Sequence, residues 1–237
     1  MCTRICFLSD GYKIKGHLHL PARKNPPVVI GSHGLFATQE SPKQLALARA
    51  CNLLGMAFFR FDHRGCGQSE GETSEQVSFN TRCKDLFRAC ETIRERSDTG
   101  FEIGLFGSSL GGAVACRISA EVQPKAVVTF AAPVSSLCIF DSIKTFGLST
   151  KYSPDFYEKL FFNNEKALSG IQNILIIHGE QDSVVPVSEA RLIFQKAIYP
   201  KKLIIQQGGD HRMTDKVHQD NFVRKTSAWF NKGFERS

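Results

Sequence analysis

The sequence predicts an α/β protein built around a doubly wound, mostly parallel sheet. Three observations support this class. Short apolar runs recur along most of the chain, which is typical of strands buried on both faces of a sheet. Helical stretches separate these runs, as they do in successive β–α units. The first twenty residues instead alternate polar and apolar side chains, which is typical of a half-buried antiparallel hairpin.

The N-terminal hairpin is predicted at residues 4–9 and 12–20, with a turn at Asp10-Gly11. An Asp-Gly pair between two strand-like segments favours a tight turn, because glycine readily adopts a positive φ. Along the second segment the exposed and buried faces alternate as Lys13, Lys15, His17 and His19 against Ile14, Leu18 and Leu20. We therefore expect two antiparallel strands before the parallel part of the sheet.

Six short apolar runs rich in β-branched and aromatic residues follow the hairpin. They lie at residues 27–31, 56–61, 102–107, 126–131, 174–179 and 202–207. Helical stretches are expected at residues 41–54, 74–96, 109–120, 188–197 and 214–230. Together with the hairpin, the runs predict a sheet of eight strands flanked by helices.

One connection is far longer than the rest, because about forty residues separate the runs at 126–131 and 174–179. Most α/β connections are much shorter. Residues 134–171 are rich in phenylalanine and tyrosine, including Phe140 and Phe146. We expect a small lid or cap after the sixth strand; the alternative is that these aromatic residues only pack the insertion onto the body. The whole chain, 1–237, is expected to form one domain.

The charge pattern does not indicate a nucleic-acid partner. The formal net charge is +7, but lysines and arginines are spread along all 237 residues. A nucleic-acid footprint would instead gather them in a patch, commonly with stacking aromatic residues. We expect a solvated cationic surface and a small-molecule substrate, with a homodimer as an open alternative.

The eight cysteines indicate free thiols in a reducing, cytoplasmic compartment. None pairs at CxxC spacing, and the opening residues do not resemble a secretory signal, so neither a disulfide framework nor a metal site is expected. No apolar run approaches the roughly 18 residues that a membrane span needs.

A glycine-flanked serine follows the run at 102–107. Gly107-Ser108-Ser109-Leu110-Gly111 fits the pattern G-x-S-x-G between a predicted strand and a predicted helix. Such a sharp turn exposes the central serine at the N-terminus of the helix, where backbone N–H groups can stabilise negative charge. Ser109 is therefore the candidate nucleophile.

A serine nucleophile needs a histidine base and a carboxylate that orients it. His211 follows the last strand and Asp182 follows the strand before it, so both should reach the sheet edge where Ser109 lies. Glu180 and Asp210 are the alternative carboxylates. We assign other positions to the remaining histidines: His17 and His19 on exposed strand faces, His63 in a surface loop, His178 at the end of a strand where it shapes the following turn, His218 on the last helix, and His33 supporting a loop.

An oxyanion hole needs two backbone donors near the nucleophile. The first should be the N–H of Leu110, directly after Ser109. The second should come from the loop I-G-S-H-G-L-F, and we assign it to Leu35, with Phe36 as the alternative.

The chain resembles the α/β-hydrolase superfamily over nearly its full length. The resemblance rests on S-H-G-L-F, F-D-H-R-G-C-G-Q-S-E-G, G-S-S-L-G-G, H-G-E-Q-D-S-V-V-P and G-G-D-H. It is greatest to small serine aminopeptidase-like and cinnamoyl or feruloyl esterase-like hydrolases. This resemblance implies an α/β-hydrolase fold, no metal or organic cofactor, and functional roles for Ser109, Asp182, His211, Leu35 and Leu110.

The predicted reaction is hydrolysis of carboxylic esters with small to medium apolar or aromatic acyl groups. Phe36, Phe140 and Phe146 are the candidate substrate-binding residues, and Leu110 makes the pocket floor more apolar than in relatives with glutamine or methionine there. Lys144, Lys151 and Lys159 either attract an anionic substrate or face solvent. Thioesterase, acyltransferase and aminopeptidase-like activities remain alternatives on the same residues, and a non-catalytic binding module is a further one.

Overall fold

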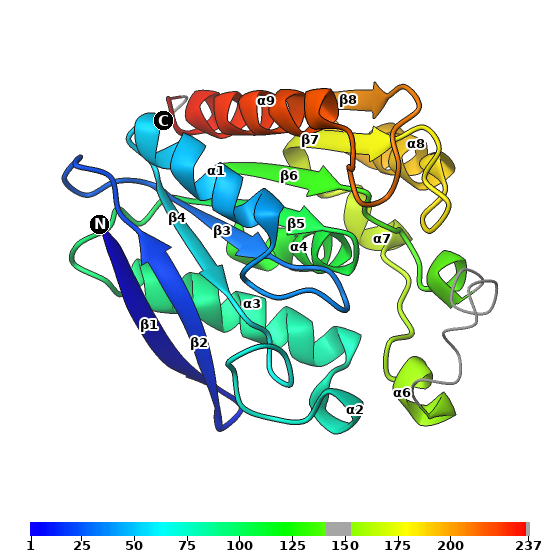
Figure 1. The fold of residues 1–237 in the computed structure, drawn as a ribbon, viewed down its shortest axis with the longest axis horizontal. Coiled ribbons are helices and arrows are strands. Elements are labelled where there is room, and N and C mark those ends of the chain that lie inside the picture. The colour runs from blue at the N-terminus through cyan, green and yellow to red at the C-terminus, as the bar shows by residue number, and fades with distance from the viewer. Residues whose placement is uncertain (141–152, 236–237) are drawn as a thin grey trace.

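The computed structural model describes residues 1–140 and 153–235. Within them lies an eight-stranded sheet with the strand order β1-β2-β4-β3-β5-β6-β7-β8 (Figure 1). The strands are β1 Cys2–Ser9, β2 Tyr12–His19, β3 Val28–Ser32, β4 Ala57–Phe61, β5 Ile103–Ser108, β6 Ala126–Phe130, β7 Gln172–Gly179 and β8 Ile198–Gln206. The predicted eight-stranded sheet is confirmed.

Only the N-terminal hairpin departs from parallel pairing among these strands. β1 pairs with β2, and β2 with β4, in antiparallel register. The other neighbours from β3 to β8 are parallel. The carboxyl ends of β5, β6 and β7 point toward the side of the molecule that carries α6 (Figure 1). The loops that leave these ends therefore meet at one edge of the sheet.

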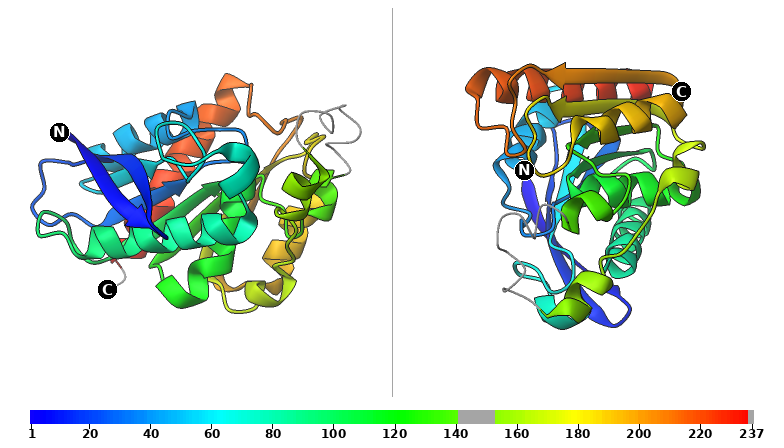
Figure 2. Two further views of the ribbon diagram at one scale, coloured as in Figure 1. Left: turned by 90° about the horizontal axis from the view of Figure 1, so that it is seen from below. Right: turned by 90° about the vertical axis from the view of Figure 1, so that its right-hand side faces the viewer.

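Helices cover both faces of the sheet, as the alternating pattern predicts. They are α1 Pro42–Leu53, α2 Thr73–Gln76, α3 Phe79–Arg94, α4 Leu110–Val122, α6 Pro154–Glu158, α7 Glu165–Leu168, α8 Val187–Lys196 and α9 Lys216–Glu235. α1 and α9 pack on one face, and α3, α4 and α8 on the other (Figure 2). None of the described helices is both long enough and apolar enough to cross a membrane.

The helix predicted at residues 74–96 is two helices. Val77 is extended and buried between α2 and α3. Ser78 caps α3, because its Oγ accepts the N–H of Thr81 at 3.0 Å while the Thr81 hydroxyl oxygen accepts the N–H of Ser78 at 2.9 Å. This reciprocal capping box starts a new helix and overrides the helical pattern across the junction.

The described aromatic residues of the long insertion pack onto the body. Phe156 and Phe162 are buried in the core that α3 and α4 share, and the Phe162 ring stacks on Phe79 with centroids 4.1 Å apart. Phe140 is partly buried against the same core. Phe146, Lys144 and Lys151 lie outside the described residues. Whether residues 134–171 act as a lid stays a prediction.

The cysteines are all free thiols. Burial raises the pKa of Cys51, Cys90 and Cys116 to about 12. These three thiols are therefore protonated at neutral pH, and a protonated, buried thiol is a poor nucleophile.

Candidate active site

Ser109 lies at the sharp turn between β5 and α4. Its backbone has φ 54° and ψ −126°, a conformation that costs an ordinary residue about 1–3 kcal/mol. The turn is held because the N–H of Ser109 donates to the carbonyl of Phe130 at 2.8 Å. Its own carbonyl accepts the N–H of Gly112 at 2.8 Å. The surrounding structure thus holds a strained residue at the end of a buried strand.

The glycines around Ser109 are required by close backbone approach. A Cβ at Gly107 would lie 2.3 Å from the carbonyl oxygen of Gly111. A Cβ at Gly111 would lie 2.2 Å from the carbonyl oxygen of Ser32 on β3. Both distances are shorter than real Cβ contacts, so any larger residue would force strand and helix apart. The spacing G-x-S-x-G therefore follows from the lack of space for a side chain at Gly107 and Gly111 in this turn.

His211 and Asp182 are brought together from the loops after β8 and β7. His211 Nδ1 lies 2.8 Å from Oδ2 of Asp182. The other carboxylate oxygen of Asp182 accepts the N–H groups of Val184 and Val185 at 2.9 and 2.8 Å. Burial alone would raise the pKa of Asp182, but hydrogen bonds with His178 and His211 outweigh it and hold that pKa well below its usual range. An ionised Asp182 fixes the proton of His211 on Nδ1 and leaves Nε2 as the basic atom.

The alternative carboxylates contact other groups. Oε2 of Glu180 accepts the N–H of Gly208 at 3.0 Å. Asp210 accepts the N–H and the hydroxyl of Thr214 at 3.0 and 2.5 Å. The carboxylate that meets His211 is that of Asp182.

His178 holds the loop that carries Asp182. Its Nε2 lies 2.8 Å from the carbonyl oxygen of Val185 and 3.4 Å from Oδ2 of Asp182. The ring is fully buried. Its position near the end of β7 agrees with the prediction, whereas its contact with the Asp182 carboxylate was not predicted.

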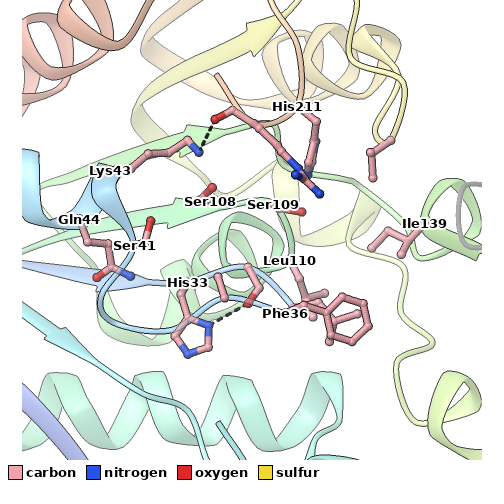
Figure 3. A pocket seen from close by; sticks show the side chains of 15 residues that line it. His33, Phe36, Ser41, Lys43, Gln44, Ser108, Ser109, Leu110, Ile139 and His211 are labelled. Carbon is pink, nitrogen blue, oxygen red and sulfur yellow. Dashed lines mark hydrogen bonds between the residues drawn. The ribbon is translucent and has the colours of Figure 1, made fainter. Parts of the chain in front are cut away.

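Ser109 and His211 line the same pocket, which has a volume of about 400 Å³ (Figure 3). In Figure 3 Ser109 lies between His211 and Leu110. Phe36, Ile139 and Val184 supply apolar lining. Phe36 is thus at the pocket, while the 133–140 segment contributes Ile139 to the lining and packs Phe140 against the core. Phe140 and Phe146 as substrate-binding residues stay predictions.

The N–H groups of Leu35 and Leu110 are available for a ligand. Both residues line the pocket with Ser109. Leu110 is the first residue of α4, so its N–H has no partner within the helix. Among the described residues, neither N–H donates a hydrogen bond to the protein. Their role as oxyanion donors stays a prediction at this point.

Arg82 holds the loop that carries Leu35, and the sequence analysis did not find it. The side chain projects from α3 and is fully buried. Its guanidinium donates to the carbonyls of His33, Gly34 and Leu35 at 2.9, 3.3 and 3.1 Å. These hydrogen bonds fix the orientation of the peptide units of the loop. In each unit the N–H group, including that of Leu35, points away from Arg82.

The placement of His63 in a surface loop was wrong, because its ring is fully buried. His63 Nε2 lies 2.9 Å from the Ser32 hydroxyl. The backbone N–H of His63 donates to Nε2 of His33 at 3.2 Å. The loop is drawn inward by Asp85 of α3, which accepts from the Arg64 guanidinium at 2.7 Å. A sequence signal existed: Arg82 and Asp85 share the helix face of Leu86, Ala89 and Ile93, where charged residues need partners.

Lys159, one of the lysines considered for anion attraction, makes a contact elsewhere. Its ammonium donates to the carbonyl of Glu75 at 3.3 Å. Among the described residues, no group of three or more histidine, cysteine, aspartate or glutamate side chains could hold a metal ion.

The sheet order, the serine turn and its place at the carboxyl edge define an α/β hydrolase. The chain belongs to the serine aminopeptidase S33 family, whose model matches residues 23–166. Among characterised relatives, it is 25% identical over 217 residues to the mitochondrial palmitoyl-protein thioesterase ABHD10 of Mus musculus, covering 81% of this chain and 71% of that protein. It is 26% identical over 237 residues to the uncharacterized protein YqkD of Bacillus subtilis, covering 93% and 75%.

Solved structures share the fold across nearly the whole chain. Est1E of Butyrivibrio proteoclasticus with bound ferulic acid superposes with a TM-score of 0.83 at 18% identity, covering 98% of this chain and 99% of that one. Mouse ABHD10 gives a TM-score of 0.72 at 21% identity, covering 97% and 99%. The family and these likenesses support a hydrolase of the α/β-hydrolase superfamily.

Proposed function

We propose that this protein is a serine esterase that cleaves carboxylic esters through an acyl-enzyme. Ser109 is the nucleophile, His211 the general base and acid, and Asp182 the carboxylate that orients His211. The observation that carries this proposal is the 2.8 Å contact between His211 and Asp182 at a pocket that Ser109 also lines.

In the first half-reaction the Ser109 oxygen attacks the ester carbonyl carbon while its proton moves to Nε2 of His211. The carbonyl oxygen becomes an oxyanion, which the N–H groups of Leu35 and Leu110 stabilise. The bond to the alcohol oxygen then breaks, and His211 returns its proton to the departing alcohol. An acyl group remains on Ser109.

In the second half-reaction water replaces the alcohol. His211 removes a proton from the water as its oxygen attacks the acyl carbon. The bond to the Ser109 oxygen breaks, His211 returns the proton to Ser109, and the carboxylic acid leaves. Asp182 stays ionised throughout, in keeping with the direction of its pKa, and stabilises the imidazolium that forms twice in the cycle.

The acyl group is placed against the apolar side of the pocket. Phe36, Ile139 and Val184 line that side, and an apolar lining favours a small to medium aliphatic or aromatic acyl group. The likeness to a structure with bound ferulic acid is in keeping with this choice. Phe140 and Phe146 are proposed to add contacts when residues 134–171 cover the site, as a cap within a single domain.

A thioesterase is the second candidate, because a relative at 25% identity is described as a palmitoyl-protein thioesterase. The same residues would cleave a thioester by the same steps, with a thiol as the departing group. An acyltransferase or a peptidase would also use them. Turnover of matched oxygen esters, thioesters and anilides distinguishes these activities.

The test is hydrolysis of p-nitrophenyl esters from acetate to laurate, with methyl ferulate, an acyl thioester and an aminoacyl anilide. We expect ester turnover that disappears in Ser109→Ala, and labelling of Ser109 by a fluorophosphonate. Ser108→Ala is the matched control for labelling, because it removes the neighbouring hydroxyl and should keep the label. A folded wild-type protein that is neither labelled nor active on any ester would rule out the esterase and favour a binding role.

A further inference from the structure

The pocket has a polar side that the proposed ester cleavage leaves unused. Ser41, Lys43 and Gln44 line it, together with Arg212. In Figure 3 Ser41, Lys43 and Gln44 lie to one side of Ser109, whereas Phe36 and Ile139 lie to the other. The catalytic serine therefore separates two chemically different halves of one pocket.

The N-terminus of α1 opens into this polar side. Ser41 is the N-cap residue and Pro42 is the first helical residue. The Ser41 side chain makes no capping hydrogen bond. Among the described residues, the N–H groups of Lys43 and Gln44 also have no protein acceptor. A helix of 12 residues with free N–H groups favours negative charge at this end.

Gln44 is a second, independent indication of a ligand. Its side chain is 1% exposed, lines the pocket, and has no hydrogen-bond partner for either Nε2 or Oε1 among the described residues. A buried amide without partners is unfavourable, because its donor and acceptor have lost their hydrogen bonds to water without replacement. The side chain is also confined, because a Cβ at Gly31 would lie 2.4 Å from Oε1. A turn of the side chain toward the pocket would let a polar ligand satisfy this amide.

The cationic side chain of Lys43 lies on the polar side (Figure 3). The Lys43 ammonium donates to the carbonyl of Arg212 at 2.9 Å and lies 5.1 Å from the centroid of the Phe130 ring, which leaves further N–H groups on the ammonium. Burial lowers the pKa of Lys43, and the Asp210 carboxylate acts in the opposite direction. Asp210 itself is bound to Thr214. Arg212, an exposed residue, also lines the pocket.

We propose that this polar side binds an anionic group on the alcohol portion of the ester substrate, through Lys43, Gln44, Ser41 and the free N–H groups that begin α1. The inference rests on the proposed function, which places the acyl group on the opposite, apolar side. A carboxylate would accept from the Lys43 ammonium or from the Gln44 amide. The substrate class is thus an ester of an apolar acid with an alcohol or phenol that carries a carboxylate.

The kinetic test compares 3-carboxyphenyl hexanoate with its neutral analogue 3-carbamoylphenyl hexanoate. The expected result is a kcat/KM ratio in favour of the carboxylate on the order of tenfold in the wild type. The ratio should fall several-fold in Lys43→Met and in Gln44→Leu. Because each variant is judged by a ratio, a general loss of activity does not affect the result. Lys202→Met is the matched control, since it removes one charge at an exposed strand position outside the pocket lining.

A binding measurement separates failure of this inference from failure of the proposed function. Calorimetry on Ser109→Ala should show tighter binding of the carboxylate ester than of the carboxamide, and Lys43→Met in the same background should abolish the difference. Equal binding of the two esters would overturn the proposal even if the enzyme hydrolyses both. A preference for a carboxylate placed only on the acyl portion, measured with p-nitrophenyl hydrogen glutarate against p-nitrophenyl pentanoate, would overturn it as well.

Discussion

The imidazole of His211 meets the carboxylate of Asp182 at 2.8 Å, although the two residues are 29 positions apart in the chain. Two adjacent parallel strands, β7 and β8, bring their loops to the same sheet edge. Asp182 keeps its position through the N–H groups of Val184 and Val185. The contact between His211 and Asp182 is therefore determined by the pairing of β7 with β8 and by the tight loop that holds Asp182.

Replacing Asp182 by asparagine should leave the fold intact and disable the base. The asparagine amide would donate to His211 and favour the wrong tautomer, which lowers kcat by about 10⁴ in serine hydrolases that use a Ser-His-Asp triad. Steady-state hydrolysis of p-nitrophenyl butyrate measures the loss, and circular dichroism checks the fold. The matched change Glu180→Gln should keep most activity. Near-normal turnover in Asp182→Asn would contradict the assigned role.

Loss of the hydrogen bonds from Arg82 to the 33–35 loop should impair catalysis more than substrate binding. Arg82→Met removes the donors that hold the carbonyls of His33, Gly34 and Leu35. We expect kcat to fall by roughly 10²–10³, comparable to the loss of one oxyanion donor, with little change in KM. Arg82→Lys should recover part of kcat, because an ammonium can still donate to one or two carbonyls.

The control for Arg82 is Arg88→Met, also on α3 but paired on the surface with Glu91. It should change neither kcat nor KM. A rise in KM without a fall in kcat in Arg82→Met would show that Arg82 supports substrate binding and does not position the N–H group of Leu35.

Acid should destabilise the protein through Asp85. Burial raises the pKa of Asp85, but the nearby His63 imidazole, 3.6 Å away, and hydrogen bonds from Arg64 outweigh burial and lower it to about 2 from 3.8. A depressed pKa contributes stability that is complete above the unfolded value and is lost as pH falls toward 2. That difference corresponds to about 2 kcal/mol.

Urea unfolding at several pH values measures this contribution. The destabilisation caused by Asp85→Asn should be largest above pH 5 and should shrink as pH falls below about 4. The exposed residue Asp155 supplies the control Asp155→Asn, which should show no comparable pH dependence. A constant difference between wild type and Asp85→Asn down to pH 2 would contradict the prediction.

Adding one methyl group at Gly111 should disrupt the serine turn. The new Cβ would lie 2.2 Å from the carbonyl oxygen of Ser32, so β3 and α4 must move apart. We expect a loss of stability of several kcal/mol, beyond the usual cost of overpacking, together with loss of fluorophosphonate labelling. Gly170→Ala is the control, because its nearest neighbour would be 3.9 Å away. Equal melting temperatures for the two variants would refute the steric argument.

The sequence could predict features that local spacing determines. G-x-S-x-G after a buried strand indicated the turn at Ser109, and the apolar runs indicated the sheet. Asp182 and His211 were chosen because each follows a strand that ends at the sheet edge where Ser109 lies. The contact between Asp182 and His211 agrees with that choice.

Features that depend on tertiary partners were out of reach. Arg82 is a charged residue on an apolar helix face, and only the fold shows that its partners are carbonyls of the 33–35 loop. His63 was placed at the surface because nothing near it in the chain reveals the Ser32 hydroxyl. The break at Ser78 has a different, local cause, since the reciprocal cap between Ser78 and Thr81 competes with helix periodicity.

The positive φ of Ser109 implies a cost in stability at the residue that we propose as the nucleophile. Glycine has no Cβ to clash in that conformation, so Ser109→Gly should relieve part of the backbone strain despite glycine's greater freedom when unfolded. We expect an inactive variant whose melting temperature equals or exceeds that of the wild type, whereas Ser109→Ala keeps the strain. Scanning calorimetry of the two variants would measure the free energy of unfolding that is lost because residue 109 is held at a positive φ.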